Sequence, residues 1–356
     1  MTKTHKLLTL ALSATLAFAA CGKDDETTTP TTPTDGEKRI EWRETYRYVH
    51  DPSEEYTQGR FSRTKCTWEG DKLKRYEAFD DDNSSRGYCE ISYENGLAKE
   101  LRMYDESGKV RESATFFYTG DKVTRVVRTT SYDDEGTWEG EYTYEYNSAG
   151  EVVKVNRPSG STTTYTWENG NIVEARFSSG GMETYTYDNK VNPDQALSVI
   201  AYVEPAPVYF SRNNIVSSTY TEEGYEDRDD YTYTYNGDYP TSQKHSYSSS
   251  YSSSYSESYS ATFFRYTDGS GMAAPEMFRI KIEDGYDYNS RPYYVIGDGT
   301  YAKGDKVVIR TSSEYYHNHN DTFYTFSRWD DGNTDNPRTF TATADVTLRP
   351  IYTAAE

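Results

Sequence analysis

The feature that most constrains this fold is a recurring unit in which a Tyr or Trp precedes a Gly-containing turn and a β-branched segment follows. Tyr142–Val155 contains the whole unit: alternating aromatic residues, the turn Asn-Ser-Ala-Gly, and then Val-Val-Lys-Val. Glycine supplies the positive φ that such a turn needs, and Asn or Asp tolerates it. The unit recurs at Trp68, Tyr93, Tyr104, Tyr118, Tyr132, Tyr146, Trp167 and Tyr235.

The spacing of these units predicts how the strands pair. From Tyr93 to Tyr146 the intervals are 11, 14, 14 and 14 residues. Each interval fits one strand plus one turn, so successive strands are expected to pair antiparallel in a meander. We therefore predict an all-β fold over residues 38–270, in which a long antiparallel meander forms a curved sheet or an open barrel.

Within each strand the pattern has a period of two. Tyr142, Tyr144 and Tyr146 share one face, and Thr143 and Glu145 take the other. Hydrophobic content is only 34%, but 37 Tyr, 13 Phe and 5 Trp supply the apolar area that a sheet needs. The apolar stretch from Pro193 to Val203 departs from the pattern, and we expect it to form a short helix or an irregular plug that caps the apolar face.

These residues also carry a resemblance to known families. Tyr104–Val110 resembles the YD unit of Rhs-type repeats. The order of YD-like hairpins, then Tyr187–Pro193, an apolar segment and Ser211–Asn214 resembles the uncharacterised Bacteroidetes lipoproteins of DUF family 4595. The resemblance covers roughly residues 40–268. It implies a long curved antiparallel sheet and no established activity.

Asp268–Pro275, which contains Gly, Ser and Pro, has the composition of a linker, and the composition of the chain changes after it. Residues 276–353 contain Gly-x-Tyr-x-x-Gly-x-x-Val at Gly299–Val307, Phe-x-x-Trp-x-x-Gly at Phe326–Gly332, and Asp345–Leu348. Their order resembles the divergent InlB B-repeat, which implies a small β-grasp-like domain.

The N-terminus predicts export and a lipid anchor. Residues 1–20 have a basic start and an apolar run, Leu7–Ala20, which is too short to span ~30 Å of hydrocarbon. The small residues before Cys21 resemble a lipobox, which implies cleavage before Cys21 and its acylation. The alternative is a conventional signal with a coincidental cysteine. Residues 21–37 then form a Thr/Pro-rich tether.

The position of Lys23–Glu26 resembles the acidic export signal of Bacteroidetes surface lipoproteins; the alternative is an acidic linker. The predicted location is the outer membrane, with a lipid anchor and exposure at the cell surface. The net charge of −20 disfavours nucleic acid and anionic lipid as partners.

The run of residues 246–260 alternates Tyr with Ser triplets or Ser-Glu-Ser. As a strand it would place Tyr247, Tyr251, Tyr255 and Tyr259 on one face. Three interpretations stay open: a strand with a solvated Ser face, a disordered insertion, or an exposed Tyr ladder that stacks on sugars.

Motifs for chemistry are scarce. The sequence contains no Gly-x-Ser-x-Gly, P-loop or His-Glu-x-x-His, and we predict neither an enzyme nor a cofactor. His317, His319 and Asp321 would share a face in a strand and are candidate ligands of a divalent metal. They lack a fourth ligand in a stretch with the composition of a loop, so the prediction is a solvated loop.

A disulfide between Cys66 and Cys89 would suit an oxidising compartment. The meander argues against it, because one strand separates the two residues, which is about 9.6 Å at ~4.8 Å per strand. A disulfide needs Cα atoms within ~7 Å.

The sequence therefore predicts a non-enzymatic cell-surface lipoprotein with a binding or adhesive role toward an extracellular glycan or protein. Two alternatives stay open. One is an envelope scaffold or a component of a larger assembly. The other is a glycan hydrolase, which would need two facing carboxylates.

Overall fold

The computed structural model describes residues 38–51, 56–132, 136–249, 257–283, 294–317 and 322–354. The side chains of Asp51, Ser249, Glu257, Ser258 and His317 are not part of this description. The predicted leader, Cys21, the tether, Tyr251, Tyr255, His319 and Asp321 lie outside the described residues.

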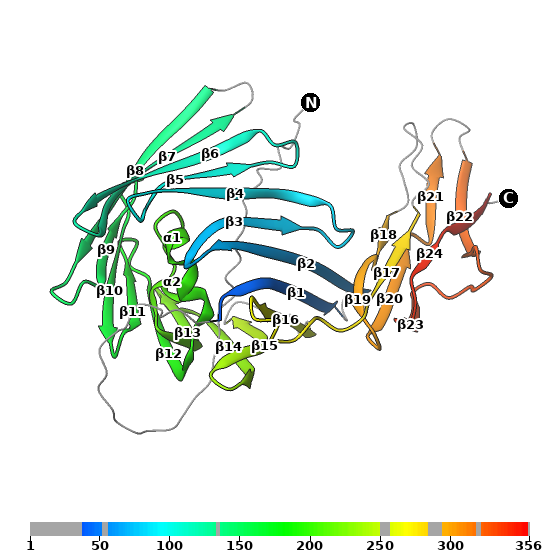
Figure 1. The fold of residues 1–356 in the computed structure, drawn as a ribbon. Coiled ribbons are helices and arrows are strands. Elements are labelled where there is room, and N and C mark those ends of the chain that lie inside the picture. The colour runs from blue at the N-terminus through cyan, green and yellow to red at the C-terminus, as the bar shows by residue number, and fades with distance from the viewer. Residues whose placement is uncertain are drawn as a thin grey trace. The chain divides into compact units, whose positions relative to one another are not determined.

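In the described part of the chain, sixteen strands form a closed antiparallel barrel in which each strand pairs with its neighbours in sequence and β16 pairs with β1 (Figure 1). The predicted meander is confirmed, and the sheet closes on itself. The strands are β1 (Ile40–Asp51), β2 (Tyr56–Glu69), β3 (Lys72–Phe79), β4 (Ser85–Glu94), β5 (Leu97–Tyr104), β6 (Val110–Thr119), β7 (Lys122–Tyr132), β8 (Gly136–Tyr146), β9 (Val152–Asn156), β10 (Thr162–Glu168), β11 (Asn171–Phe177), β12 (Met182–Val191), β13 (Asn213–Glu222), β14 (Tyr225–Asn236), β15 (Tyr239–Ser249) and β16 (Glu257–Tyr266).

The aromatic residue before a turn has a specific structural task. The strand register shifts at this residue, as at Tyr93, Tyr118 and Tyr146, so each lies at a β-bulge. Its polar tip then donates a hydrogen bond to a backbone carbonyl near the start of the preceding strand. These bonds run from Trp68 Nε1 to Ile40 O (2.8 Å), Tyr93 OH to Leu73 O (2.9 Å), Tyr118 OH to Ala98 O (2.7 Å), Tyr146 OH to Val123 O (2.7 Å) and Trp167 Nε1 to Val152 O (2.7 Å).

A helical segment follows β12, as predicted for the apolar stretch. It consists of a 3₁₀ turn, η1 (Pro193–Leu197), and the short helices α1 (Ser198–Ala201) and α2 (Pro207–Phe210). Asp194 forms an ion pair with Arg43 on β1, and the Tyr202 carbonyl accepts a 2.6 Å hydrogen bond from Tyr144 on β8. Because β1 and β8 lie about half of the ring apart, a segment that contacts both must lie inside the barrel.

The inner face of the barrel is mainly apolar, and the outer face carries many charged residues. Val126 and Tyr144 are buried in a core that includes Leu197 and Ile200 of the helical segment. Residues that alternate with the inward ones carry ion pairs between neighbouring strands: Arg75 with Glu90 (3.1 Å), Arg125 with Glu141 (3.1 Å) and Lys154 with Glu145 (2.9 Å). The predicted division of β8 into an aromatic face and a polar face is thereby confirmed.

The two described cysteines are free and buried. Cys66 on β2 and Cys89 on β4 both pair with Tyr76 on β3, so one strand separates them as the meander predicted. Burial raises the pKa of each thiol to about 12.

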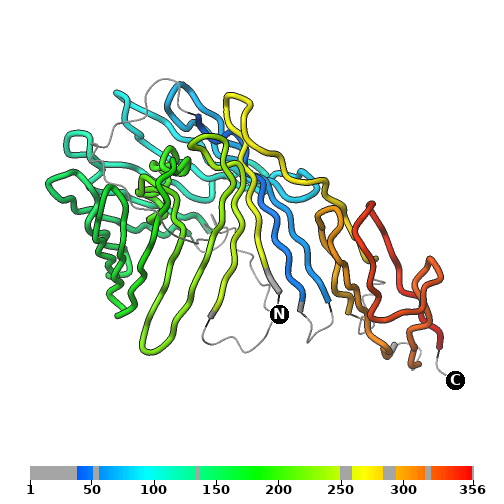
Figure 2. Tube along the Cα trace, turned by 90° about the horizontal axis from the view of Figure 1, so that it is seen from below, coloured from blue at the N-terminus to red at the C-terminus, as the bar shows by residue number. Residues whose placement is uncertain are grey.

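The chain divides into two compact units. The described residues of the first fall in Met1–Arg43, Arg63–Tyr251 and Phe263–Met272; those of the second fall in Glu44–Ser62, Ser252–Thr262 and Ala273–Glu356. Figure 2 traces the chain through successive strands. The C-terminal strands are β17 (Met277–Ile282), β18 (Val295–Ile296), β19 (Gly299–Ala302), β20 (Lys306–Thr311), β21 (Glu314–His317), β22 (Thr322–Trp329), β23 (Arg338–Thr341), β24 (Val346–Leu348) and β25 (Pro350–Ala354).

The second unit has its own core. Its fully buried members include Tyr301, Val307, Ile309 and Trp329. β17 pairs antiparallel with β19 and parallel with β24, whereas β22 pairs with β21 and β25. Glu314–His317 forms strand β21, so the prediction of a loop is wrong for Tyr315–His317, and it is not tested for the residues up to Asp321, which lie outside the described ranges. In the described part of the chain, no helix has the length and apolar character needed to cross a bilayer.

Candidate ligand pocket

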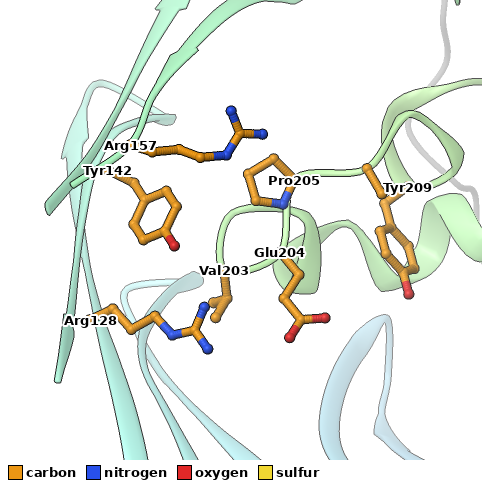
Figure 3. A pocket seen from close by; sticks show the side chains of 8 residues that line it. Arg128, Tyr142, Arg157, Val203, Glu204, Pro205 and Tyr209 are labelled. Atoms are coloured by element: carbon orange, nitrogen blue, oxygen red, sulfur yellow. The ribbon is translucent and has the colours of Figure 1, made fainter. Parts of the chain in front are cut away.

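A pocket of about 280 Å³ lies between the barrel wall and the helical segment, within the first unit (Figure 3). Its volume is slightly below the ~300–1,000 Å³ of typical small-molecule sites. The wall contributes Arg128, Tyr142 and Arg157, and the helical segment contributes Val203, Glu204, Pro205, Ala206 and Tyr209. Two guanidinium groups, a phenol and a carboxyl group therefore lie around one small space that is partly apolar.

Arg128 is held in place by a buried carboxylate. It lies on β7 opposite Ala114 of β6 and Gly140 of β8, on the same inward face as Val126. Its guanidinium forms an ion pair with Glu112, and Arg128 Nη2 donates to Glu112 Oε2 over 2.7 Å. Glu112 is only 8% exposed. The charge of Arg128 is therefore largely balanced before any ligand binds.

Arg157 differs from Arg128 in its partners. It follows β9 and begins a tight turn, in which its N–H donates to Ser161 O and its carbonyl accepts from Gly160 N. Its Nη1 donates to Thr163 Oγ1 over 2.6 Å. Among the described residues its partners are neutral hydroxyl groups and no carboxylate forms an ion pair with it. Arg157 thus brings a positive charge to the pocket that this acidic chain does not balance locally.

Glu204 faces the pocket from the helical segment. Burial raises the pKa of its carboxyl group above the usual value, the Arg128 charge opposes this shift, and the Glu112 charge adds to it. Of the described residues that line the pocket, Glu204 alone carries a carboxylate. A glycan hydrolase needs two facing carboxylates, and nearby Glu112 directs its oxygens to Arg128.

The predicted Tyr ladder is not a single strand. Tyr247 lies on β15, which ends at Ser249, whereas Tyr259 lies on β16, which begins at Glu257. The interpretation of residues 246–260 as one strand is therefore wrong, because a period of two cannot distinguish one strand from two. Tyr247 is 50% exposed and donates to Asp227 Oδ1 over 2.8 Å. Tyr259 stacks on Tyr48 at 5.4 Å in the second unit.

Neither described member of the ladder lines the pocket. A role in ligand contact for Tyr247, Tyr251, Tyr255 and Tyr259 stays a prediction. Among the described residues, no cluster of three His, Cys, Asp or Glu side chains is arranged to hold a metal ion.

Sequence reasoning did not select the residues that line the pocket. One signal was present: Arg128 shares the inward face of β7 with Val126, so a charged side chain stands at a core position. Arg157 and Glu204 carry no such signal. They meet Arg128 only because the barrel closes around the helical segment.

No protein-family model matches this chain, and no curated protein does. Among solved structures, a porin-like protein from Bacteroides uniformis has 15% identity, a match over 68% of this chain and 100% of that chain, and a TM-score of 0.44. A porin-like protein from Bacteroides vulgatus has 12% identity, 65% and 99% coverage, and a TM-score of 0.30. The TcdB2-TccC3-Cdc42 structure has 11% identity, 76% and 16% coverage, and a TM-score of 0.24. All three TM-scores are below 0.5, so these similarities carry no argument about function.

Proposed function

We propose that this chain is a non-enzymatic, lipid-anchored protein of the outer-membrane surface that binds an extracellular ligand inside its barrel. The observation that carries the proposal is the pocket between the barrel wall and the helical segment, where Arg128, Tyr142, Arg157 and Glu204 converge. Convergent polar groups in a small, partly apolar space are the usual basis of small-ligand recognition. The leader and Cys21 supply the anchor in this proposal, and residues 22–37 are the tether.

The polarity of the barrel supports the same proposal. A barrel whose strands cross a bilayer has an apolar outer band about 25 Å tall and a polar interior. Here the outer positions of β7–β9 carry the ion pairs of Arg125 and Lys154, whereas the interior is an apolar core filled by the helical segment. Such a barrel suits water on its outside. In the proposal, the acyl chains at Cys21 therefore provide the membrane attachment.

We also propose that the barrel is a YD-like repeat region and that the C-terminal strands form an InlB B-repeat-like module. The hairpins with Asp and Gly turns support a YD-like repeat region related to DUF family 4595. The parallel pairing of β17 with β24 beside the antiparallel β19 supports a β-grasp-like, InlB B-repeat-like module at the C-terminus.

The test combines binding and localisation. Full-length protein purified from membranes is applied to a glycan array and used in pull-downs from growth medium. We expect a specific ligand in at least one format, together with incorporation of labelled palmitate that Cys21→Ser abolishes. Blank results in both binding formats would remove the binding role, and palmitate incorporation by the Cys21→Ser variant would remove the anchor.

A second candidate, a component of a larger envelope assembly, has one observation in its favour. The β21–β22 hairpin presents Phe323, 55% exposed, against Tyr316 at 4.8 Å between ring centroids. Aromatic residues exposed in this way are common at protein interfaces. Recovery of the same neighbour from membranes with wild-type protein and its loss with Phe323→Ser would favour this candidate.

A further inference from the structure

We propose that the pocket binds an acidic sugar, a pyranose ring with a carboxylate, in which the carboxylate is held by Arg157 and the ring face lies on Trp138. This inference rests on the proposed binding function and names its ligand class. Two independent observations support it: the Arg157 guanidinium, which has no carboxylate partner among the described residues, and the exposed Trp138 indole, which lies over Gly140, the strand partner of Arg128.

Trp138 lies on β8 and is 42% exposed, although it stands on the same face of the strand as Tyr142 and Tyr144. The Trp138 ring and Pro158 both lie against Gly140: a Cβ placed on Gly140 would come within 2.2 Å of the Trp138 ring and 2.6 Å of Pro158 Cγ. Only glycine at position 140 leaves room for the ring there. The indole is thus supported from one side while much of its surface remains exposed.

The position of this indole connects it to the pocket. Gly140, under the ring, pairs directly with Arg128 across the β7–β8 ladder and precedes Tyr142 by two residues. Pro158, which also lies against Gly140, follows Arg157 in sequence. Gly140 is therefore the strand partner of Arg128, and Pro158 is the chain neighbour of Arg157. Arg128 and Arg157 both line the pocket. In the proposal, a ligand on the indole extends from there to Arg157.

The Arg157 guanidinium and the Trp138 indole together indicate the chemical class of the ligand. A guanidinium prefers a planar carboxylate, which it binds through two parallel hydrogen bonds. The aromatic face suits the apolar C–H face of a pyranose ring, while Tyr142 and Glu204 offer hydrogen bonds to ring hydroxyl groups. A neutral sugar would leave Arg157 without an anionic partner, and a simple carboxylate such as acetate would provide no ring to stack on the indole. The combination selects an acidic sugar over both.

The test is a titration of the purified full-length protein, followed by tryptophan fluorescence and calorimetry, with glucuronate, galacturonate, glucose and acetate as probes. We expect a uronate to bind at least about tenfold more tightly than glucose or acetate and to change the fluorescence. Arg157→Gln should weaken uronate binding about tenfold, with Arg157→Lys intermediate because it keeps the charge but loses the planar fork. Trp138→Ala should weaken binding and remove the fluorescence change.

The matched control is Arg125→Gln, which removes an arginine from the outer face of β7, the strand that carries Arg128. It should bind uronate as the wild type does, and thermal unfolding of every variant reports whether the fold is intact. Equal affinity for glucose and uronate, no uronate binding, or unchanged uronate binding in a folded Arg157→Gln variant would each overturn the inference. If the array identifies a neutral glycan instead, the proposed binding function stands and this inference fails; if no format yields a ligand, both fail.

Discussion

At the scale of single residues, the structure explains why Tyr or Trp, and not Phe, stands before most turns. The ring fills the core, while its hydroxyl or indole N–H satisfies a carbonyl beside a β-bulge, where the ladder is interrupted. Tyr118 illustrates this: its ring packs on the barrel core and its OH donates to Ala98 O over 2.7 Å. A phenylalanine would supply the ring without the hydrogen bond.

Tyr118→Phe is therefore expected to lower the free energy of unfolding by about 0.5–1.5 kcal/mol, the usual cost of one lost hydrogen bond. Urea denaturation followed by circular dichroism measures the change. Tyr132→Phe is the control, because Tyr132 is 41% exposed and should change stability very little. A Tyr118→Phe variant as stable as the control would show that the shape of the ring, and not its hydroxyl, explains the pattern along this chain.

The raised pKa of the Glu204 carboxyl group leads to a prediction about how stability and ligand affinity depend on pH. Burial raises the pKa of this carboxyl group, Arg128 lowers it, and Glu112 raises it further. Its folded-state pKa lies above the unfolded value of about 4.3, so the folded protein favours the neutral form of Glu204. The stability that the protein has while Glu204 is neutral is lost as pH rises through the folded pKa. The neutral form also repels an anionic ligand less, so uronate affinity should fall over the same rise in pH.

Glu204→Gln should flatten this pH dependence while leaving Arg128, Arg157 and Tyr209 in place around the site. Calorimetric titration of uronate from about pH 4.5 to 7.5 covers the rise above the usual carboxyl pKa and leaves the ligand carboxylate ionised. An identical slope in Glu204→Gln would assign the effect to another group. A slope in the opposite direction would contradict the sign of the shift.

At the scale of elements, the helical segment is held inside the barrel by polar contacts as well as by apolar packing. Asn192 caps η1 by accepting from Asp194 N over 3.0 Å and donates to Val208 O (2.6 Å) and Ser211 O (2.9 Å). Asp194 in turn forms an ion pair with Arg43. Both side chains are mostly buried, at 18% and 16% relative exposure for Arg43 and Asp194. Removal of one partner would leave the other charge poorly solvated.

Asp194→Asn should accordingly destabilise the protein by about 2–4 kcal/mol, near the lower end of the cost of breaking a buried pair. Hydrogen exchange should speed up first in residues 192–211, because the segment loses its tie to β1. Asp238→Asn is the control: it breaks the Lys190–Asp238 pair, in which the Asp238 side chain is 69% exposed, and should cost under about 1 kcal/mol. Equal losses in both variants would show that the interior pair has no special role.

The sequence predicted the strands and their order better than it predicted the residues of the pocket. The aromatic spacing predicted the antiparallel order, and the meander predicted that one strand separates Cys66 from Cys89, which their pairing with Tyr76 from opposite sides confirms. These properties depend on neighbours within one or two strands. The pocket depends on closure, because Arg128 and Glu204 meet across the barrel interior. A local period of two holds no information about which strands face each other across a closed ring.

At the scale of the whole molecule, the distribution of polarity leads to a prediction about membrane attachment. Charged pairs such as Arg75–Glu90 and Arg125–Glu141 stand on outward positions. If Cys21 alone attaches the protein, Cys21→Ser should release it into the aqueous fraction without detergent, with an unchanged all-β circular dichroism spectrum. Fractionation and size-exclusion chromatography measure this, and the wild type should require detergent.

Reconstitution into planar bilayers provides the complementary measurement. The barrel interior is occupied by an apolar core and the helical segment, so neither the wild type nor Cys21→Ser should produce ion conductance. Retention of Cys21→Ser in the membrane after a high-pH wash, together with stepwise conductance, would mean that the strands themselves contact lipid. The outward ion pairs would then have to be rearranged in the membrane, because each buried and unshielded charge would cost several kcal/mol.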